Sequence, residues 1–163
     1  AMISMGLPLP ASAAPVYWDI NGSTAGASGS GSATGTWDAS SAFWNDATGT
    51  GTAAAWLSGD TAIFSAGTNA TLPFTVTVSG TQQIGGLGFE EGRVTLTGGI
   101  VQMSTASNFD VASLLTGTVN SVVDGGFNLT KTGAGTLVLG GANTYSGNTI
   151  INAGTLSISS DAR

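Results

Sequence analysis

Residues 129–158 read LTKTGAGTLVLGGANTYSGNTIINAGTLSI and contain two copies of a Gly-Thr-Leu triplet. The triplets begin at Gly135 and Gly154, nineteen residues apart, and each opens a short β-type run. A turn-rich segment over 140–148 and a third run over 149–151 lie between them. Strands and turns that repeat near 20 residues are typical of one coil of a β-solenoid. This stretch therefore predicts an all-β solenoid.

Upstream of this stretch, short runs alternate apolar and small residues with period two, as half-buried strands do. These runs cover 61–64, 74–78, 84–89, 94–97 and 100–103. Residues 108–123 are less regular, and we expect Val111, Leu114 and Leu115 to be core residues there. A sandwich or a barrel would also fit such strands, but the period favours a solenoid of roughly four or five coils.

The composition limits the possible functions of this chain of 163 residues. Charged residues make up only 7%, and 26 glycines argue against long helices. A net charge of −6 with three basic residues lacks the positive surface that nucleic acids and anionic membranes require. The absence of cysteine and histidine removes disulfides, thiolate metal sites and the commonest general base. No run is long enough for a transmembrane helix, and we expect no cofactor.

Changes in composition divide the chain into three parts. Residues 1–14 are apolar and end near Ala11-Ser12-Ala13, which has the small-x-small form of a signal-peptide cleavage site. They are a signal-peptide remnant, a cloning remnant or an apolar N-terminal arm, and the sequence leaves open whether the mature protein keeps them. Residues 15–66 form a cap region rich in Trp, Gly and Ser, and residues 67–163 form the β-helix.

The cap region contains all four tryptophans and a group of four aspartates. We expect the tryptophans to form a buried aromatic cap over the first coil, because each indole buries a large apolar area. The alternative is an exposed platform for carbohydrate. For the aspartates we expect turn and capping roles, with a Ca²⁺ site or catalysis as alternatives. The residues concerned are Trp18, Trp37, Trp44 and Trp56, and Asp19, Asp38, Asp46 and Asp60.

The stretch quoted first also carries a longer motif. It reads Leu129-x-Lys131-x-Gly133-x-Gly135-Thr136-Leu137-x-Leu139-x-Gly141-x-Asn143-x-Tyr145-x-Gly147-x-Thr149-x-Ile151-x-x-Gly154-Thr155-Leu156. This motif closely resembles the passenger-associated transport repeat of bacterial autotransporters, also called the autotransporter-associated β-strand repeat. The resemblance implies a right-handed parallel β-helix on a Gram-negative cell surface or in the medium, and a role in type V secretion. Autotransporters also carry a C-terminal membrane barrel, which these 163 residues do not show, so we expect either a segment of a longer passenger or a free-standing protein built from the same repeat.

Each motif residue has an expected structural role. Leu137, Leu139, Ile151, Leu156 and Ile158 should point into the solenoid, and Thr136, Thr149 and Thr155 should lie at outward or turn positions. Gly133, Gly135, Gly141, Gly147 and Gly154 suit turns with positive φ or close approach of neighbouring coils. Asn143 and Asn148 can bond turn backbone, Tyr145 should pack on the next coil, and Leu129 and Lys131 are structural.

Together these features predict a structural, non-catalytic β-helix of an exported surface or secreted protein. The alternative is an adhesin-type module that binds carbohydrate through the Trp cluster, and the third possibility is a polysaccharide-active enzyme. The acidic residues are scattered, which argues against the enzyme. The chain stops soon after a repeat strand, so we expect its last coil to stack end to end on another copy or on further passenger sequence.

Overall fold

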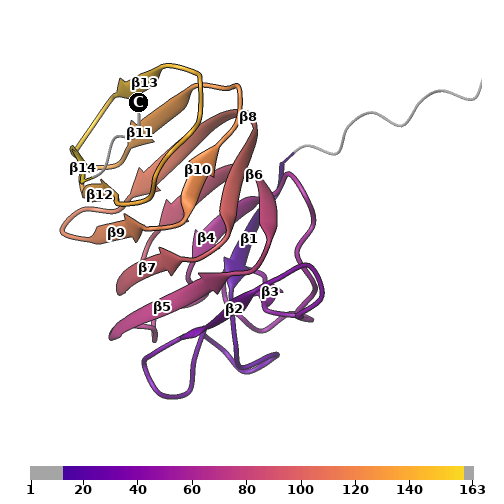
Figure 1. Ribbon diagram of the computed structural model, residues 1–163. Helices are drawn as coiled ribbons and strands as arrows, with labels where there is room; N and C mark the ends of the chain where they lie inside the picture. Colours follow the sequence, from indigo (N-terminus) through magenta and orange to yellow (C-terminus); the bar gives the residue numbers. More distant parts are fainter. Residues whose placement is uncertain (1–12, 160–163) are drawn as a thin grey trace, which may run out of the picture.

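The computed structural model of the protein describes residues 13–159, which wind into a column of stacked coils (Figure 1). These residues form strands and turns and contain no helix. The strands are β1 Pro15–Trp18, β2 Gly35–Trp37, β3 Trp44–Asn45, β4 Thr61–Phe64, β5 Pro73–Val78, β6 Thr81–Phe89, β7 Arg93–Thr97, β8 Ile100–Val111, β9 Thr116–Val119, β10 Val122–Asp124, β11 Leu129–Thr132, β12 Thr136–Leu139, β13 Thr149–Ile151 and β14 Thr155–Ile158.

As the chain winds, each coil adds strands to both of two sheets. One sheet runs in the order β13-β11-β8-β6-β4-β1-β3, with β10 also paired to β8, and the other in the order β14-β12-β9-β7-β5-β2. Every pair except β1–β3 is parallel. Figure 1 shows the strands of successive coils lying above one another.

The register of the second sheet gives the length of each coil. Phe74 pairs with Val94, Val94 with Gly117, Gly117 with Leu137, and Leu137 with Leu156. The successive steps are therefore 20, 23, 20 and 19 residues, and the column makes about four turns. The predicted parallel β-solenoid is confirmed.

Alternating burial explains why these runs form strands. In β5, β7, β9 and β12 every second residue is buried, and its neighbour is partly or fully exposed. The inward side chains stack on those of the next coil, so one apolar core runs along the column. The strands expected from the period-two alternation are all present, and β8 is longer than predicted.

The expectation for residues 108–123 was wrong in two respects. These residues contain the end of β8 and all of β9, and they reach into β10, so the segment is as regular as the rest of the column. Val111 is buried and Leu115 is partly buried against the core, but Leu114 is 99% exposed. Leu114 occupies a turn between β8 and β9 with φ of 67°, and this conformation directs it away from the core.

The tryptophan-rich part continues the same two sheets. β1 pairs with β4, β4 with β6, and β2 with β5, all in parallel. Residues 1–12, most of the expected N-terminal arm, lie outside the described residues. The boundaries at 14 and 66 stay predictions. Among residues 13–159, no helix is long and apolar enough to cross a membrane.

Candidate functional site

The repeat over 129–158 forms the last two coils that the structure describes. Leu129, Leu137 and Leu139 are fully buried, and Leu156 is partly buried against the same core. Ile151 pairs with Lys131, and Ile158 pairs with Leu139. Both isoleucines therefore lie on the inward side of their strands, yet they are 56% and 50% exposed because they belong to the last described coil.

The three motif threonines do not all face outward. Thr136 and Thr155 pair with each other on the outer side of the second sheet, as expected. Thr149 pairs with buried Leu129 and precedes Ile151 by two residues, so it lies on the inward side of β13. Thr149 was expected at an outward or turn position, but it is the first residue of β13 and lies on its inward side, because side chains alternate along a strand.

The motif glycines fall into two groups. Gly133 and Gly154 have φ of 70° and 69°, a backbone conformation that L side chains rarely adopt. A Cβ at any of the remaining three would press on a backbone oxygen of the preceding coil. Those three are Gly135 against Ala112, Gly141 against Ser121, and Gly147 against Phe127. Both kinds of requirement were expected, and Gly133 and Gly154 meet both, because a Cβ there would also press on backbone oxygens of Val111 and Gly135.

Polar motif side chains complete the corner between β12 and β13. Oδ1 of Asn143 accepts a hydrogen bond from the backbone N–H of Val123 at 3.0 Å, which replaces a missing strand bond to the preceding coil. The Tyr145 hydroxyl pairs with Thr149 Oγ1 at 2.7 Å, and its ring packs on the core. At Asn148 the backbone makes the bonds: its N–H donates to Asn128 Oδ1 at 2.9 Å.

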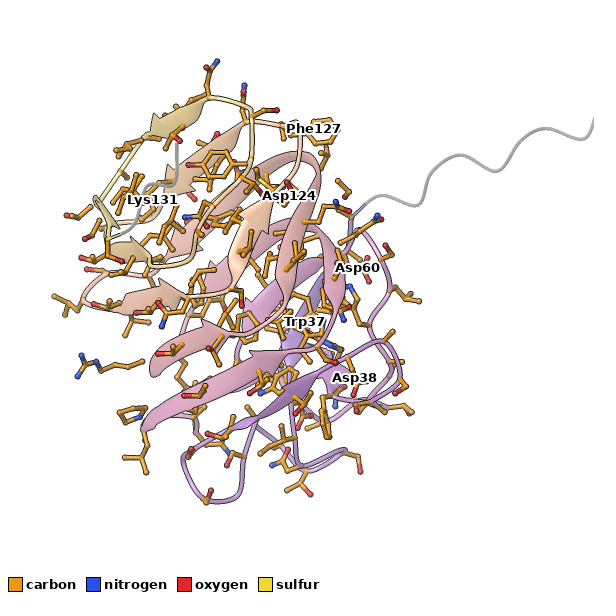
Figure 2. The ribbon with its side chains drawn as sticks, viewed as in Figure 1. Trp37, Asp38, Asp60, Asp124, Phe127 and Lys131 are labelled. Carbon is orange, nitrogen blue, oxygen red and sulfur yellow. The ribbon has the colours of Figure 1, made fainter. Side chains whose placement is uncertain are left out.

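Lys131 is fully buried, which the sequence did not reveal. Its Nζ donates to the carbonyl oxygens of Thr132, Gly133 and Ala153, the last two at 2.8 and 3.3 Å. Burial lowers the pKa of Lys131, and the nearby charge of Asp110 acts in the opposite direction. Figure 2 shows the side chain among the upper coils of the column. The sequence does hold a signal for this burial: Lys131 follows apolar Leu129 by two residues, and alternate residues of a strand share a face.

A ladder of polar side chains crosses the coils on the β6–β8–β10 side. Ser58 Oγ donates to Gln83 Oε1 at 2.9 Å, Gln83 Nε2 to Gln102 Oε1 at 3.1 Å, and Gln102 Nε2 to Asp124 Oδ2 at 3.2 Å. Thr144 Oγ1 donates to Asp124 Oδ1 at 3.0 Å. The pKa of Asp124 is lowered, mainly by the N–H of Gly125 and further by the bonds from Gln102 and Thr144. The sequence reading missed this ladder, although its members recur about once per coil.

The four tryptophans form one buried cluster at the other end of the column. Trp18, Trp37 and Trp44 are at most 2% exposed and Trp56 is 6% exposed. Ring centroids of Trp37, Trp44 and Trp56 lie 4.7–5.0 Å apart, mostly edge to face. A carbohydrate platform needs exposed indole faces, so the burial agrees with the aromatic cap and gives the platform no support.

Two of the four aspartates of this region bind their own turns, and the other two bind residues distant in sequence. Asp38 accepts from the N–H groups of Ser40 and Ser41 at 2.7 and 2.6 Å, and Asp46 accepts from Thr48 N–H at 2.8 Å. Buried Asp19 accepts from Asn45 Nδ2 at 2.8 Å, and Asp60 from Ala14 N–H at 3.2 Å. Across the described part of the chain, no three acidic side chains come together as metal ligands. Asp38, Asp60 and Asp124 lie at different heights in Figure 2.

Two shallow hollows on the cap side lack acidic and basic groups. One of about 380 Å³ is lined by Ala25, Gly26, Ala47, Thr48, Gly67, Thr68 and Asn69. The other, of about 360 Å³, is lined by Ala39, Trp56, Ser58, Thr81, Gln82 and Gln83. Enzyme sites need titratable or nucleophilic groups that converge on one point. The hydroxyls that line the two hollows, such as those of Ser58 and Thr81, have no titratable side chain beside them in the lining that could act as a base.

Two comparisons with known proteins relate this chain to autotransporters. A family described as Passenger-associated-transport-repeat matches residues 129–158. Over 166 aligned residues, the chain is 40% identical to a protein of Brucella suis biovar 1 (strain 1330) named "Adhesin BmaC autotransporter". The alignment covers 99% of this chain and 5% of that protein, so the chain spans about one-twentieth of its relative's length. No solved structure matches the chain.

Proposed function

Because this chain carries the passenger-associated transport repeat of bacterial autotransporters, we propose that it is a coil-forming, non-catalytic passenger segment. In this role the chain extends a parallel β-helix outside a Gram-negative cell, either on the surface or in the medium. Its role is structural, because each coil presents a complete sheet edge and an apolar core on which the next coil stacks.

The in-register stacking of the repeat carries this proposal. Leu137 and Leu139 of β12 lie directly over Leu156 and Ile158 of β14. The two strands are joined by parallel pairing through Thr136–Thr155 and Val138–Ser157 as well. A unit built in this way cannot bury its inner face alone and depends on its neighbours. The scattered, turn-bound acids support a role without catalysis.

Surface display in a Gram-negative host would test the proposal. The 163-residue chain would be placed within an autotransporter passenger, and a folded, protease-resistant segment on intact cells would be measured. Leu139→Asp should sharply reduce the resistant segment, because it buries an unpaired charge in the core. The matched control Val138→Asp adds the same charge one residue earlier, on the outer side, and should retain it.

Two results would contradict this function. Equal effects of Leu139→Asp and Val138→Asp would mean that core stacking does not govern display. Failure of the parent chain to yield a protease-resistant surface segment, while the host passenger alone does, would mean that these coils do not form outside the cell.

A further inference from the structure

Lys131 occupies a column of otherwise apolar positions. Through the parallel register it follows Ala62 of β4, Leu87 of β6 and Phe109 of β8, which are all buried. The residue that follows it in the next coil is Ile151. A buried ammonium is strongly unfavourable unless polar groups of the protein replace its lost water. The sequence therefore places a cation where every neighbouring coil has a hydrocarbon.

Carbonyl oxygens from two successive corners replace that water. Thr132 is the last residue of β11 and Gly133 opens the corner that follows it, whereas Ala153 belongs to the corner that follows β13. An ammonium has three N–H donors, and these three carbonyls accept from all of them. The charge of Lys131 is therefore fully solvated by backbone only when the second corner is in place.

Gly154 fits the second corner to this ammonium. Its φ is 69°, and a Cβ built there would lie 2.9 Å from Lys131 Nζ and would press on the carbonyl oxygens of Gly133 and Gly135. Backbone bonds flank the contact on both sides, from Asn152 N–H to Lys131 O at 2.9 Å and from Thr155 N–H to Gly135 O at 3.1 Å. The glycine leaves space for the ammonium and for both carbonyls.

We propose that Lys131 is a docking residue, whose buried ammonium binds the corner of the following coil at Ala153–Gly154. The feature that the ammonium recognises is a backbone corner whose carbonyl oxygen points into the core and whose next residue is a glycine. Lys131 and Gly154 are 23 residues apart, more than the 19-residue step between β12 and β14, so the contact joins two coils. The inference rests on the proposed function in one respect, that residues 129–158 act as a coil-forming repeat.

The chain contains a single lysine, so amine acylation reports on this site directly. The purified 163-residue protein would be treated with an acylating ester under native conditions, and labelling of the Lys131 peptide would be followed by mass spectrometry. We expect labelling at least 100-fold slower than in the urea-unfolded chain. Gly154→Ala, which obstructs the second corner, should raise the native labelling rate at least tenfold.

Gly99→Ala is the matched control, since Gly99 also has positive φ, at 41°, and its added Cβ would press on backbone oxygens of Gly80 and Val78. It lies between β7 and β8, away from the Lys131 corner. Its Lys131 labelling should stay within twofold of the parent rate. Equal acceleration by the two alanine variants would overturn the proposal, and so would labelling of the folded parent at the unfolded rate.

A second variant keeps the test valid if Gly154→Ala does not fold. Lys131→Met should raise hydrogen exchange at Asn152 and Thr155 at least tenfold and leave Val94 and Leu96 unchanged. Arg93→Met, which removes an exposed cation, should change neither pair. If Lys131→Met accelerates hydrogen exchange equally at both pairs, or at neither, the docking proposal is overturned.

The docking proposal and the proposed function can fail separately. If Lys131 is protected from labelling but the chain is not displayed on cells, only the proposed function fails. If the chain is displayed but Lys131 is labelled freely, only the docking proposal fails.

Discussion

Single residues show how a protein with only 7% charged residues uses them. Asp38 and Asp46 are held by N–H and hydroxyl groups of their own turns, whereas Lys131 is held by the backbone of two coils. Glu90 has a raised pKa because of burial and the neighbouring charge of Asp110. Asp38, Asp46 and Lys131 thus stabilise local turns and a contact between coils, whereas the charged form of Glu90 is disfavoured where it lies.

The Asp38 turn gives a prediction for pH dependence. The N–H groups of Ser41 and Ser40, followed by their hydroxyls, lower the pKa of Asp38 from 3.8 to about 2. Because the folded pKa is the lower one, the carboxylate stabilises the fold above pH 3.8, and this contribution is lost as the pH falls through about 2. Carboxyl ¹³C NMR should show an Asp38 midpoint near pH 2.

A double variant supplies the control for this titration. Ser40→Ala with Ser41→Ala removes both hydroxyl donors, so the Asp38 midpoint should move back toward 3.8. The Asp124 midpoint should not change, because its donors lie elsewhere. An Asp38 midpoint near 3.8 in the parent chain would show that the turn does not form as described.

The alternation of residues within single strands was readable from the sequence, but exceptions to it depended on contacts. Leu114 is apolar, and only its turn conformation explains why it points outward. Gly117 occupies a core position of β9, where an added Cβ would press on the Phe89 ring of the preceding coil. An aromatic ring from a residue 28 positions earlier thus replaces the expected apolar side chain. Such replacement hid β9 from a period-two reading.

Asn143 carries a prediction for the corner between β12 and β13. Asn143→Ala leaves the backbone N–H of Val123 without its acceptor, so the free energy of unfolding should fall by about 1–3 kcal/mol. Asn148→Ala is the control, because Asn148 bonds its neighbours through its backbone, and it should change the free energy by less than about 0.5 kcal/mol. Urea unfolding measures both values, and equal losses would contradict the assigned role of the Asn143 side chain.

At the scale of the whole molecule, one apolar core joins the tryptophan cluster to the repeat. Phe64 contacts Trp18, Trp37 and Trp44 and stacks on Phe89 with centroids 5.7 Å apart. The period and the motif were enough to predict the solenoid and its repeat. They could not predict the Lys131 contact or the polar ladder, because those depend on which residues of different coils meet. End-to-end stacking of copies stays a prediction.

The central claim is that the repeat stacks with a step of nineteen residues, and paired cysteines test it directly because the chain has none of its own. Val138 and Ser157 pair on the outer side of β12 and β14, and strands in one sheet lie about 4.8 Å apart, within the range for a disulfide. Thr155 lies on the same side, one diagonal position away, at roughly 8 Å, beyond that range.

Oxidation of the two double variants, followed by mass spectrometry, is therefore decisive. Val138→Cys with Ser157→Cys should form an intramolecular disulfide rapidly and nearly completely. Val138→Cys with Thr155→Cys should remain mostly reduced. Preferential bridging of the second pair, or equal bridging of both, would contradict the nineteen-residue coil on which this account depends.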